Sequence, residues 1–233
     1  MLELDRLIIT QDDFRLTADF TIPAAARVAV IGPSGAGKST LLSVISGYFP
    51  PESGRIRWDA QDITDTAPGL RPLSILFQDQ NLFPHLTVSQ NVGLGLRPDL
   101  RLTSSDRARV AEALARTGLA GLDDRRPGTL SGGQQSRVAL ARVLLRARPL
   151  MLLDEPFAAL GPALKAEMLE LVGEIAGETG ATVLMVSHDP GDALSFAGLT
   201  VLVANGVAHA PRPTAALLAD PPAELAAYLG RPG

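Results

Sequence analysis

The amino-acid sequence predicts an α/β protein built on a parallel sheet. Short apolar runs without charges, such as Val28–Ile31 and Leu150–Leu153, are typical of strands that are buried on both faces. These runs alternate with segments in which apolar residues recur at helical spacing. A glycine-rich turn joins one such strand directly to a helix. A length of 233 residues suits one large domain with an inserted subdomain, so we expect a single domain over 1–233.

The composition excludes several classes of site. The chain has no cysteine, which excludes disulfides and cysteine-ligated metals, and its 3 histidines are too scattered to suggest a metal site. A formal net charge of -4 argues against a protein held on nucleic acid by bulk charge. The N-terminus has no basic segment followed by an apolar one, so no signal peptide is expected. We therefore expect a soluble, cytoplasmic protein.

The first quarter of the chain predicts two strands and a helix. Polar and apolar residues alternate strictly over Phe14–Ile22, as in a half-buried antiparallel strand. Its apolar face carries Phe14, Leu16, Ala18, Phe20 and Ile22. The run Arg27–Gly32 follows as a buried parallel strand, and a glycine-rich turn leads from it into the helical stretch Lys38–Phe49.

The middle of the chain, from about residue 83 to residue 147, has a different character. It contains two helix-like patterns, "SSDRARVAEALARTGL" and "QQSRVALARVLLRA", and little strand signal. Ser104 or Ser105 is the expected N-cap of the first of these helices. We interpret 83–147 as a helical insertion in the α/β core.

The last third returns to alternating strands and helices. Two buried parallel strands are expected, in "PLMLLDEP" and "ATVLMVSHD", and an amphipathic helix between them ends before Gly180. The inward face of that helix carries Leu164, Met168, Leu171, Val172 and Ile175. The uncharged run 193–211 is long, but Gly198, the pair Asn205-Gly206 and His209 interrupt it, so a strand, a turn and a strand are expected there rather than a membrane span.

The glycine-rich turn "GPSGAGKST" matches the phosphate-loop pattern G-x-x-x-x-G-K-[ST], between a strand and a helix as that pattern requires. Gly35 and Gly37 let the backbone curl so that its N–H groups face phosphate oxygens. Lys38 reaches the β- and γ-phosphates, and the hydroxyl of Ser39 binds Mg²⁺. The expected nucleotide-binding residues of this loop are Gly32, Pro33, Ser34, Gly35, Ala36, Gly37, Lys38, Ser39 and Thr40.

Two acids and a histidine follow the expected strands of the last third. Asp154 emerges at the carboxyl end of its strand, where ligands bind in open α/β sheets, and fits the acid that holds Mg²⁺ in phosphate-loop ATPases. Glu155 comes one residue later and points differently, so its expected role is the general base that deprotonates the attacking water. His188 follows the next expected strand, at the same edge of the sheet, within reach of a γ-phosphate.

A second glycine turn, "LSGGQ" at Leu130–Gln134, opens the second helical pattern. Paired glycines at a helix start pack nothing, so we expect a phosphate to approach the backbone there. Together with the phosphate loop, Gln78 in "LFQDQ", "LLDEP" and His188, in that order, this turn makes the sequence similar to the nucleotide-binding subunits of ABC transporters. The resemblance covers nearly the whole chain.

This resemblance implies a fold, a set of ligands and a mode of assembly. The fold is an ABC cassette with a RecA-like parallel-sheet core, an N-terminal antiparallel β subdomain and an α-helical subdomain that corresponds to 83–147. Family members work as head-to-tail dimers. In these dimers the turn that corresponds to "LSGGQ", called the signature turn below, faces the γ-phosphate bound by the other subunit. In this chain that turn contributes Ser131, Gly132, Gly133 and Gln134. ATP and Mg²⁺ are implied, with Ser39, Gln78 and Asp154 at the metal and Glu155, His188 and Gln78 as catalytic residues.

Two features depart from the family pattern. After "LLDEP" the family has Ser-Ala-Leu-Asp, whereas this chain has Ala158 for the serine and Gly161 for the aspartate. That aspartate normally contacts the partner's phosphate-loop region, so tight coupling between the two nucleotide sites is not implied here. The family also places an aromatic residue before the phosphate loop to stack on adenine. Phe14 is the nearest candidate, although it also belongs to the apolar face of its strand.

Within the family the sequence is most similar to importer subunits, through the segment Asn81–Leu96. The segments Gly32–Gly54 and Arg71–Leu100 look most like those of thiamine-import ATPases. This likeness implies an ATP hydrolase that energises uptake of thiamine or a related small solute. The implied partners are a second copy of the chain, transmembrane permease subunits and, through them, a periplasmic solute-binding protein, without nucleic acid. The implied location is the cytoplasmic face of the inner membrane.

Other interpretations stay open. Related importers carry iron, polyamines, sulfate or molybdate. Soluble ABC ATPases that act on DNA, ribosomes or Fe–S assembly often have tandem cassettes or long coiled-coil inserts, which are not seen in this sequence. A nucleotide-binding regulator without turnover is motivated by Gly161. A GTPase is disfavoured, because no asparagine is followed by the guanine-reading Lys-x-Asp.

Overall fold

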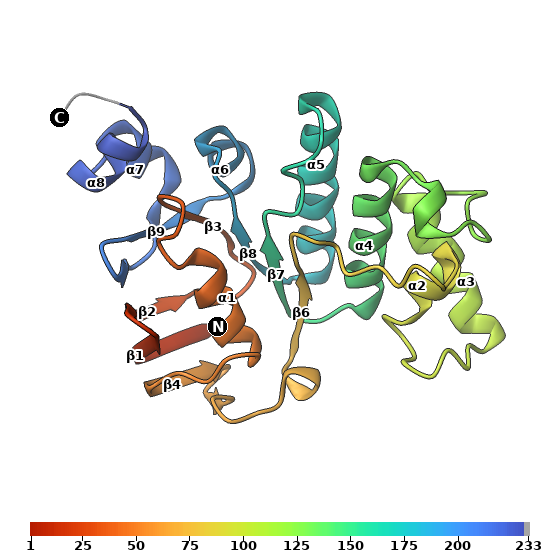
Figure 1. Cartoon of the computed structure of the whole chain (residues 1–233), viewed down its shortest axis with the longest axis horizontal. Coiled ribbons are helices and arrows are strands. Elements are labelled where there is room, and N and C mark those ends of the chain that lie inside the picture. Colours follow the sequence, from red (N-terminus) through yellow and green to blue (C-terminus); the bar gives the residue numbers. More distant parts are fainter. Residues whose placement is uncertain (231–233) are drawn as a thin grey trace.

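The computed structural model describes residues 1–230 and shows a twisted sheet with helices on both faces and a group of helices beyond one edge (Figure 1). Within these residues the strands form one 11-stranded sheet in the order β5-β4-β1-β2-β10-β9-β3-β8-β7-β6, with β11 beside β9. The strands are β1 (Leu2–Gln11), β2 (Phe14–Ile22), β3 (Arg27–Ile31), β4 (Ser53–Trp58), β5 (Gln61–Asp62), β6 (Leu73–Leu76), β7 (Leu150–Asp154), β8 (Thr182–Val186), β9 (Leu199–Ala204), β10 (Val207–Ala208) and β11 (Arg212–Pro213). The helices are α1 (Lys38–Ser46), α2 (Val88–Gly93), α3 (Ser104–Arg116), α4 (Gly132–Arg146), α5 (Pro162–Thr179), α6 (Pro190–Phe196), α7 (Thr214–Ala219) and α8 (Ala223–Tyr228), with 3₁₀ turns at Pro68–Leu70 and Pro127–Thr129.

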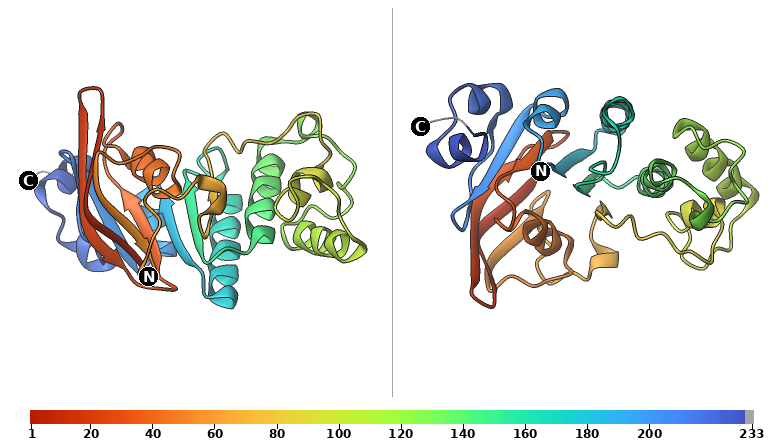
Figure 2. Two further views of the ribbon diagram at one scale, coloured as in Figure 1. Left: turned by 90° about the horizontal axis from the view of Figure 1, so that it is seen from below. Right: turned by 45° about the horizontal axis from the view of Figure 1, so that its top comes forward.

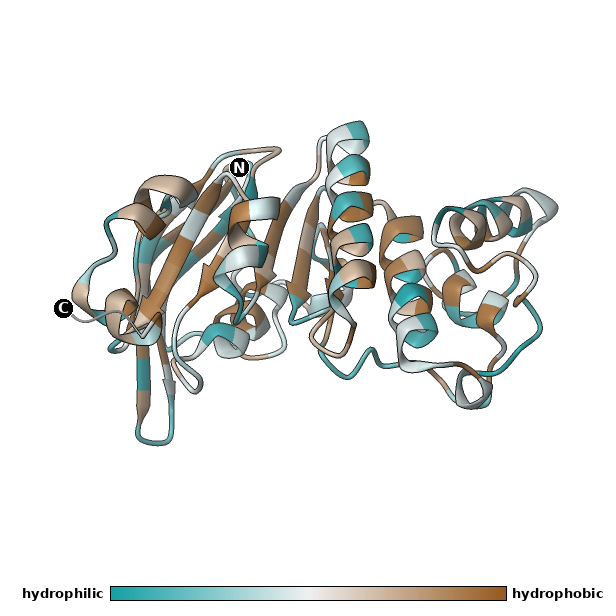
Figure 3. Cartoon of the chain, turned by 90° about the horizontal axis from the view of Figure 1, so that it is seen from above, coloured by the Kyte–Doolittle hydropathy of each residue, from teal (hydrophilic) through white to brown (hydrophobic). Residues whose placement is uncertain are grey.

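The strands β9, β3, β8, β7 and β6 are parallel neighbours and form the core of the fold. Their residues alternate between two hydrophobic clusters. Val28 and Val30 of β3 pack with the residues of α1, whereas Ala29 and Ile31 pack with those of α5 and α6. Both faces of these strands are therefore buried, which explains why the sequence shows them as continuous apolar runs and confirms the predicted α/β class. Figure 3 shows the core strands as mostly hydrophobic, while α5 carries hydrophobic and hydrophilic residues around its axis.

The other half of the sheet, β5-β4-β1-β2, is antiparallel. The predicted alternation of β2 is confirmed, since Leu16, Ala18, Phe20 and Ile22 are buried and Phe14 is partly buried. The run 193–211 contains the end of α6, then β9, a turn at Asn205-Gly206 and β10, as the predicted strand, turn and strand require. In the part of the chain that the structure describes, no helix is long and apolar enough to cross a membrane.

The segment 83–147 holds α2, α3 and α4, which lie beyond β6 at one end of the molecule (Figures 1 and 2). These helices share a hydrophobic core of their own, in which Val92, Leu114 and Val138 are buried. Helix α4 is common to two cores, because its Leu140 and Val143 pack instead with residues of β7 and α5. This helix therefore connects the helical segment to the sheet.

The predicted cap of α3 is wrong. Neither Ser104 nor Ser105 caps this helix; both belong to its first turn. Thr103 is the N-cap, and its side chain accepts a hydrogen bond from the N–H of Asp106, whose carboxylate accepts one from the N–H of Thr103. Of Thr103, Ser104 and Ser105, only Thr103 has an acid three residues later with which to form this reciprocal pair. The pair satisfies two backbone N–H groups that would otherwise lack an acceptor.

Arg71 is a buried cation that joins α1 to the segment before β6. Its side chain is 2% exposed. The guanidinium donates to the carbonyls of Val44 and Ile45, in the last turn of α1, at 3.1 and 2.7 Å. It also donates to the backbone carbonyls of Thr64 and Thr66, at 2.6 and 2.8 Å. The C-terminal carbonyls of a helix carry partial negative charge, so this contact compensates the buried cation.

We expect Arg71→Met to lower the free energy of unfolding by about 3–5 kcal/mol, because it removes a buried charged donor and leaves several carbonyls unpaired. Arg55→Met is the matched control, since Arg55 is exposed and lies 3.8 Å from Asp62. Such surface pairs contribute about 0–1 kcal/mol. Urea denaturation of both variants measures the difference, and equal effects would contradict the role given to Arg71.

Candidate active site

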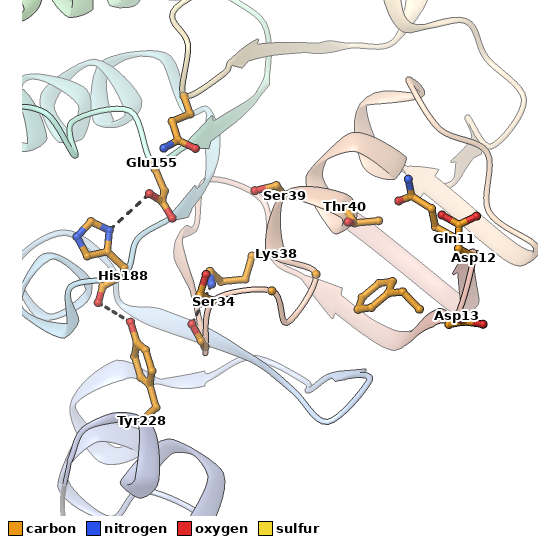
Figure 4. A pocket seen from close by; sticks show the side chains of 15 residues that line it. Gln11, Asp12, Asp13, Ser34, Lys38, Ser39, Thr40, Glu155, His188 and Tyr228 are labelled. Atoms are coloured by element: carbon orange, nitrogen blue, oxygen red, sulfur yellow. Dashed lines mark hydrogen bonds and ion pairs between the residues drawn. The ribbon is translucent and has the colours of Figure 1, made fainter.

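Residues from distant parts of the chain meet in a cavity of about 840 Å³ at the carboxyl ends of the core strands. The turn between β1 and β2, the phosphate loop, the segment after β6 and the ends of β7 and β8 all contribute to it (Figure 4). Of the residues predicted from sequence, the lining contains Phe14, Gly32, Ser34, Gly35, Gly37, Lys38, Ser39, Thr40, Gln78, Glu155 and His188, whereas Pro33 and Ala36 of the loop do not line it. Asp154 lies beside it, hydrogen-bonded to Ser39.

Three glycines of the phosphate loop have positive φ, each in a different setting. At Gly32 (φ 150) an added Cβ would stand 2.0 Å from the carbonyl oxygen of Val203 on β9, so the loop passes too close to that strand for any side chain. At Gly37 (φ 99) a Cβ would meet the ring of Phe14 at 2.3 Å. At Gly35 (φ 75) nothing lies within 4 Å. Gly35 is thus the position at which the backbone is open to a ligand.

Lys38 begins α1 and is 7% exposed. Its ammonium donates to the carbonyls of Gly32 and Pro33 at 2.9 and 2.8 Å. Burial lowers the pKa of Lys38, opposed by the negative charges of Glu155 and Asp154. A buried cation held only by carbonyl dipoles at the start of a helix is suited to exchange these partners for phosphate oxygens.

Ser39 and Asp154 form the candidate Mg²⁺ site. The Ser39 hydroxyl donates to Asp154 Oδ1 at 3.0 Å. Burial raises the pKa of the Asp154 carboxyl, while the hydrogen bond from Ser39 lowers it. Two adjacent oxygen ligands beside a phosphate loop fit Mg²⁺, which prefers oxygen and takes its remaining ligands from phosphates and water. Within residues 1–230 no group of three or more His, Cys, Asp or Glu side chains gathers to hold a metal, so these ligands would not form a complete protein cage.

Glu155 turns away from Asp154 through an uncommon backbone conformation. Its φ is 45, the left-handed region that side chains other than glycine rarely adopt. The N–H of Glu155 donates to Val186 at 3.2 Å, which holds the end of β7 against β8. Its carboxylate thereby enters the cavity, 3.6 Å from Nδ1 of His188 (Figure 4). Backbone strain of this kind persists only where the surrounding structure maintains it, and it is concentrated at functional sites.

The signature turn does not line this cavity. Ser131 caps α4, accepting from the N–H of Gln134 at 3.3 Å, and the Gln134 side chain accepts from the N–H of Ser131 at 3.0 Å. Nothing lies within 4 Å of a Cβ added at Gly132, whereas at Gly133 it would meet the Leu164 side chain at 2.9 Å. From the sequence, both glycines are expected to admit an approaching phosphate. Gly133 has a second reason, since it lets the start of α5 approach α4.

The residues that depart from the family pattern have clear local settings. Gly161 is the N-cap of α5 without a side-chain cap, and a Cβ added there meets nothing within 4 Å. Phe14 lies on the phosphate loop through its contact with Gly37 and is partly buried against the main core. Its stacking on adenine stays a prediction.

Sequence reasoning missed four residues that line the cavity. Gln11, Asp12 and Asp13 come from the β1–β2 turn, and Tyr228 comes from α8. None belongs to a local pattern. Only the pairing of β1 with β2 and the return of the C-terminal helix bring these residues to the phosphate loop, so no signal in the sequence could have identified them.

Comparison with known proteins identifies the family of this chain. Residues 16–158 match the family model described as ABC transporter. The chain therefore belongs to the ABC transporter family, as one of its ATP-binding and ATP-hydrolysing subunits. It is 67% identical to the thiamine import ATP-binding protein ThiQ of Cereibacter sphaeroides over 230 residues, which cover 99% of this chain and 100% of that protein. It is 57% identical to ThiQ of a Ruegeria species, over the same shares of each chain.

Solved structures confirm the cassette fold. The ATP-binding cassette MJ0796, as a post-hydrolysis dimer bound to ADP and phosphate, matches with a TM-score of 0.81 and 28% identity over 92% of this chain and 99% of that one. The cassette cbiO1 of Clostridium perfringens, part of the transporter complex cbiONQ, matches with a TM-score of 0.80 and 30% identity over 94% of this chain and 90% of that one. MJ0796 was thus solved as a dimer, and cbiO1 is one component of a transporter complex.

We expect Asp154→Asn to raise the thermal midpoint of the nucleotide-free protein by about 2–4 °C, which corresponds to about 1 kcal/mol at this chain length. The substitution removes a buried charge but keeps an acceptor for Ser39. Hydrolysis of Mg²⁺-ATP should be lost. Asp124→Asn, at an exposed acid, is the control and should change neither property. Calorimetry and phosphate release measure the pair, and a fall in the midpoint would show that the Asp154 charge stabilises the fold.

Proposed function

We propose that this chain binds and hydrolyses Mg²⁺-ATP through the residues of this cavity and thereby energises thiamine import through a permease. The observation that carries the hydrolytic part is the divergence of two adjacent acids. Asp154 stays with Ser39, while the left-handed turn at Glu155 directs its carboxylate into the cavity beside His188. The identity to thiamine import ATP-binding proteins supports the solute.

In this proposal Lys38 and the N–H groups of the phosphate loop bind the phosphates. Lys38 leaves the carbonyls of Gly32 and Pro33 and pairs with β- and γ-phosphate oxygens. Ser39, Asp154 and Gln78 would hold Mg²⁺, which neutralises charge on the phosphates when bound. Glu155 orients the attacking water and accepts its proton, because its carboxylate faces the space in front of the loop. His188 donates a hydrogen bond to the γ-phosphate.

A second copy of the chain would complete the site. Ser131 and Gly132 are exposed, and nothing of their own subunit lies within 4 Å of a Cβ added at Gly132. The exposed N-terminus of α4 suits the γ-phosphate of a nucleotide held by a partner. The dimeric post-hydrolysis state of MJ0796 supports this arrangement. A two-fold axis then provides two equivalent composite sites.

We expect Glu155→Gln to trap an ATP-bound dimer, because the variant keeps the shape of the site but lacks the base. Adding Ser131→Arg should abolish the dimer while leaving ATP binding to the phosphate loop intact. Size-exclusion chromatography with and without ATP and Mg²⁺ measures the dimer, and fluorescent-nucleotide titration measures binding. Ser105→Arg in the Glu155→Gln background is the control, since Ser105 is an exposed serine in the first turn of another helix.

The wild-type chain should be mostly monomeric without nucleotide. A Glu155→Gln chain that binds ATP and stays monomeric would contradict the composite site. Full turnover by Glu155→Gln would instead contradict the role of Glu155 as the base.

A groove of about 340 Å³ between the sheet and the helical segment is the proposed docking site for the permease. It is lined by Tyr48, Phe77, Phe83, Leu94, Arg142 and Arg146. Tyr48 and Phe83 are exposed, at 60% and 46%, and Leu70 next to the groove is 79% exposed. Exposed apolar side chains gathered around a concave surface indicate an interaction site. A short amphipathic helix of a membrane subunit fits this chemistry, with its apolar face in the groove.

Whether thiamine is the transported solute is tested by measuring uptake of labelled thiamine, in cells that have no other ATP-binding subunit for thiamine import. We expect uptake to require the chain and to be lost with Glu155→Gln. Phe83→Ala should reduce uptake and co-purification with the permease by at least about tenfold, as loss of a buried interface anchor does. Val207→Ala, another exposed apolar residue far from the groove, should reduce neither.

Uptake of iron, a polyamine, sulfate or molybdate that depends on the chain, without thiamine uptake, would assign a related importer instead. ATP hydrolysis by a chain that associates with no membrane subunit would assign a soluble ABC ATPase. A periplasmic thiamine-binding protein that stimulates hydrolysis in the assembled complex would identify the third component of the system.

A further inference from the structure

We propose that Tyr228 is a positioning residue for ATP hydrolysis, which holds the backbone at His188 so that the imidazole stays opposite Glu155. The proposal rests on the roles given above to Glu155 and His188. Tyr228 belongs to the last helix of the described chain, α8, and no motif of the sequence pointed to it.

The contact lies inside the cavity. The phenol of Tyr228 donates a short hydrogen bond to the carbonyl oxygen of His188 (Figure 4). The same histidine places Nδ1 3.6 Å from Glu155 Oε2. Tyr228 and His188 both line the cavity together with Lys38 and Glu155. One hydrogen bond therefore connects α8 to the residue that faces the proposed base.

Helix α8 is a firm support for this contact. Leu225 is 0% exposed and Ala226 is 8% exposed. Leu225 belongs to the hydrophobic cluster in which α5 and α6 pack against the core strands. Tyr228 and Leu229 pack against the same cluster, which contains Leu202 of β9. The phenol thus has a fixed place relative to the sheet, whereas the His188 side chain is 57% exposed and has little packing of its own.

The residues after His188 are held from another direction. Lys165 of α5 pairs with Asp189 at 3.0 Å and with Asp192 at 2.7 Å. The hydroxyl of Ser187 donates to Asp192 at 2.6 Å. These contacts hold Asp189 directly to α5, and they hold Ser187 to Asp192 of α6, which is itself paired with α5. Tyr228 holds the carbonyl of His188 itself from the α8 side, so the segment Ser187–Asp189 is clamped between two helices.

The electrostatic surroundings keep the phenol in the form that donates. Burial raises the pKa of Tyr228, and the negative charges of Glu155 and Asp189 raise it further. The hydroxyl therefore stays protonated at neutral pH. Alignment of a base, a water and a phosphate is sensitive to displacements of about 1 Å, so loss of this clamp should affect turnover more than nucleotide binding.

Tyr228→Phe tests the clamp, because it removes only the hydroxyl. We expect kcat for ATP hydrolysis by the full chain to fall about 3- to 10-fold, as loss of one neutral hydrogen bond allows, with KM for ATP changed less than about twofold. Thr179→Val is the matched control, since the Thr179 hydroxyl also donates to a backbone carbonyl, that of Ile175 at 2.7 Å, and Thr179 does not line the cavity. It should leave both constants unchanged.

Histidine-labelled NMR of the nucleotide-free chain supplies a readout that needs no turnover. The chain has 3 histidines, and His188→Ala identifies the His188 resonance by its loss. Tyr228→Phe should shift or broaden that resonance alone and leave those of His85 and His209 in place. An unchanged His188 resonance, or an unchanged kcat, would overturn the proposal. Changes at all three histidines with a thermal midpoint lowered by more than about 5 °C would show a general loss of structure and would also overturn it.

The two proposals fail in different ways. If Glu155→Gln turns over ATP as fast as the wild type, the catalytic assignment is wrong, while the His188 resonance still reports whether Tyr228 holds the segment. If Glu155→Gln is inactive but Tyr228→Phe changes neither kcat nor the resonance, the assignment stands and the clamp is wrong.

Discussion

The close passage of the phosphate loop over β9 is the constraint on which the site depends. Strand β3 lies between β9 and β8, and Gly32 leaves it with its Cα against the carbonyl of Val203. Only a residue without a side chain fits there, so a glycine at this position is required for the loop to follow its path into the cavity. The neighbouring strands β8 and β7 end at the same level, so they deliver His188 and Asp154 to the same edge. The parallel order of the sheet thus gathers the site, and the loop fixes where its ligand lies.

Burial of charge at this edge makes the free site costly. Lys38 and Asp154 are both buried, and burial opposes ionisation of each. Their mutual attraction compensates only part of the desolvation, because Lys38 hydrogen-bonds to carbonyls and Asp154 to a hydroxyl rather than to each other. A nucleotide phosphate and its metal offer each of them a full charge. The same groups that reduce the stability of the empty fold therefore supply binding energy, which is the usual relation between stability and function at a site.

The sequence alone predicts those parts of the molecule that depend on local sequence patterns. The phosphate loop, the buried strands and the acids at the end of β7 follow from period, charge and glycine placement. The predicted cap of α3, Ser104 or Ser105, is wrong by one or two residues, because capping depends on which side chain reaches the third N–H rather than on residue type alone. Tyr228 and the β1–β2 turn were invisible, since their places follow from tertiary packing. The sequence predicts a ligand as the reason for Gly133, whereas its close approach to Leu164 shows that internal packing also requires a glycine there.

The segment after β6 gives a physical path from the nucleotide to the proposed docking groove. Gln78 lines the cavity, and Asn81 lines the groove only three residues later. Between them, Gln80 donates to Ser136 of α4 at 2.6 Å, and Arg142 of α4 donates to the carbonyls of Gln80 and Asn81 at 2.8 and 2.9 Å. Both Gln80 and Asn81 have positive φ, so this stretch holds a conformation that depends on those contacts. The helix that receives them begins at the signature turn, where a second nucleotide would bind. In the proposed mechanism, displacement of Gln78 by a nucleotide would therefore reach α4 through these three hydrogen bonds, and through α4 the groove and the signature turn.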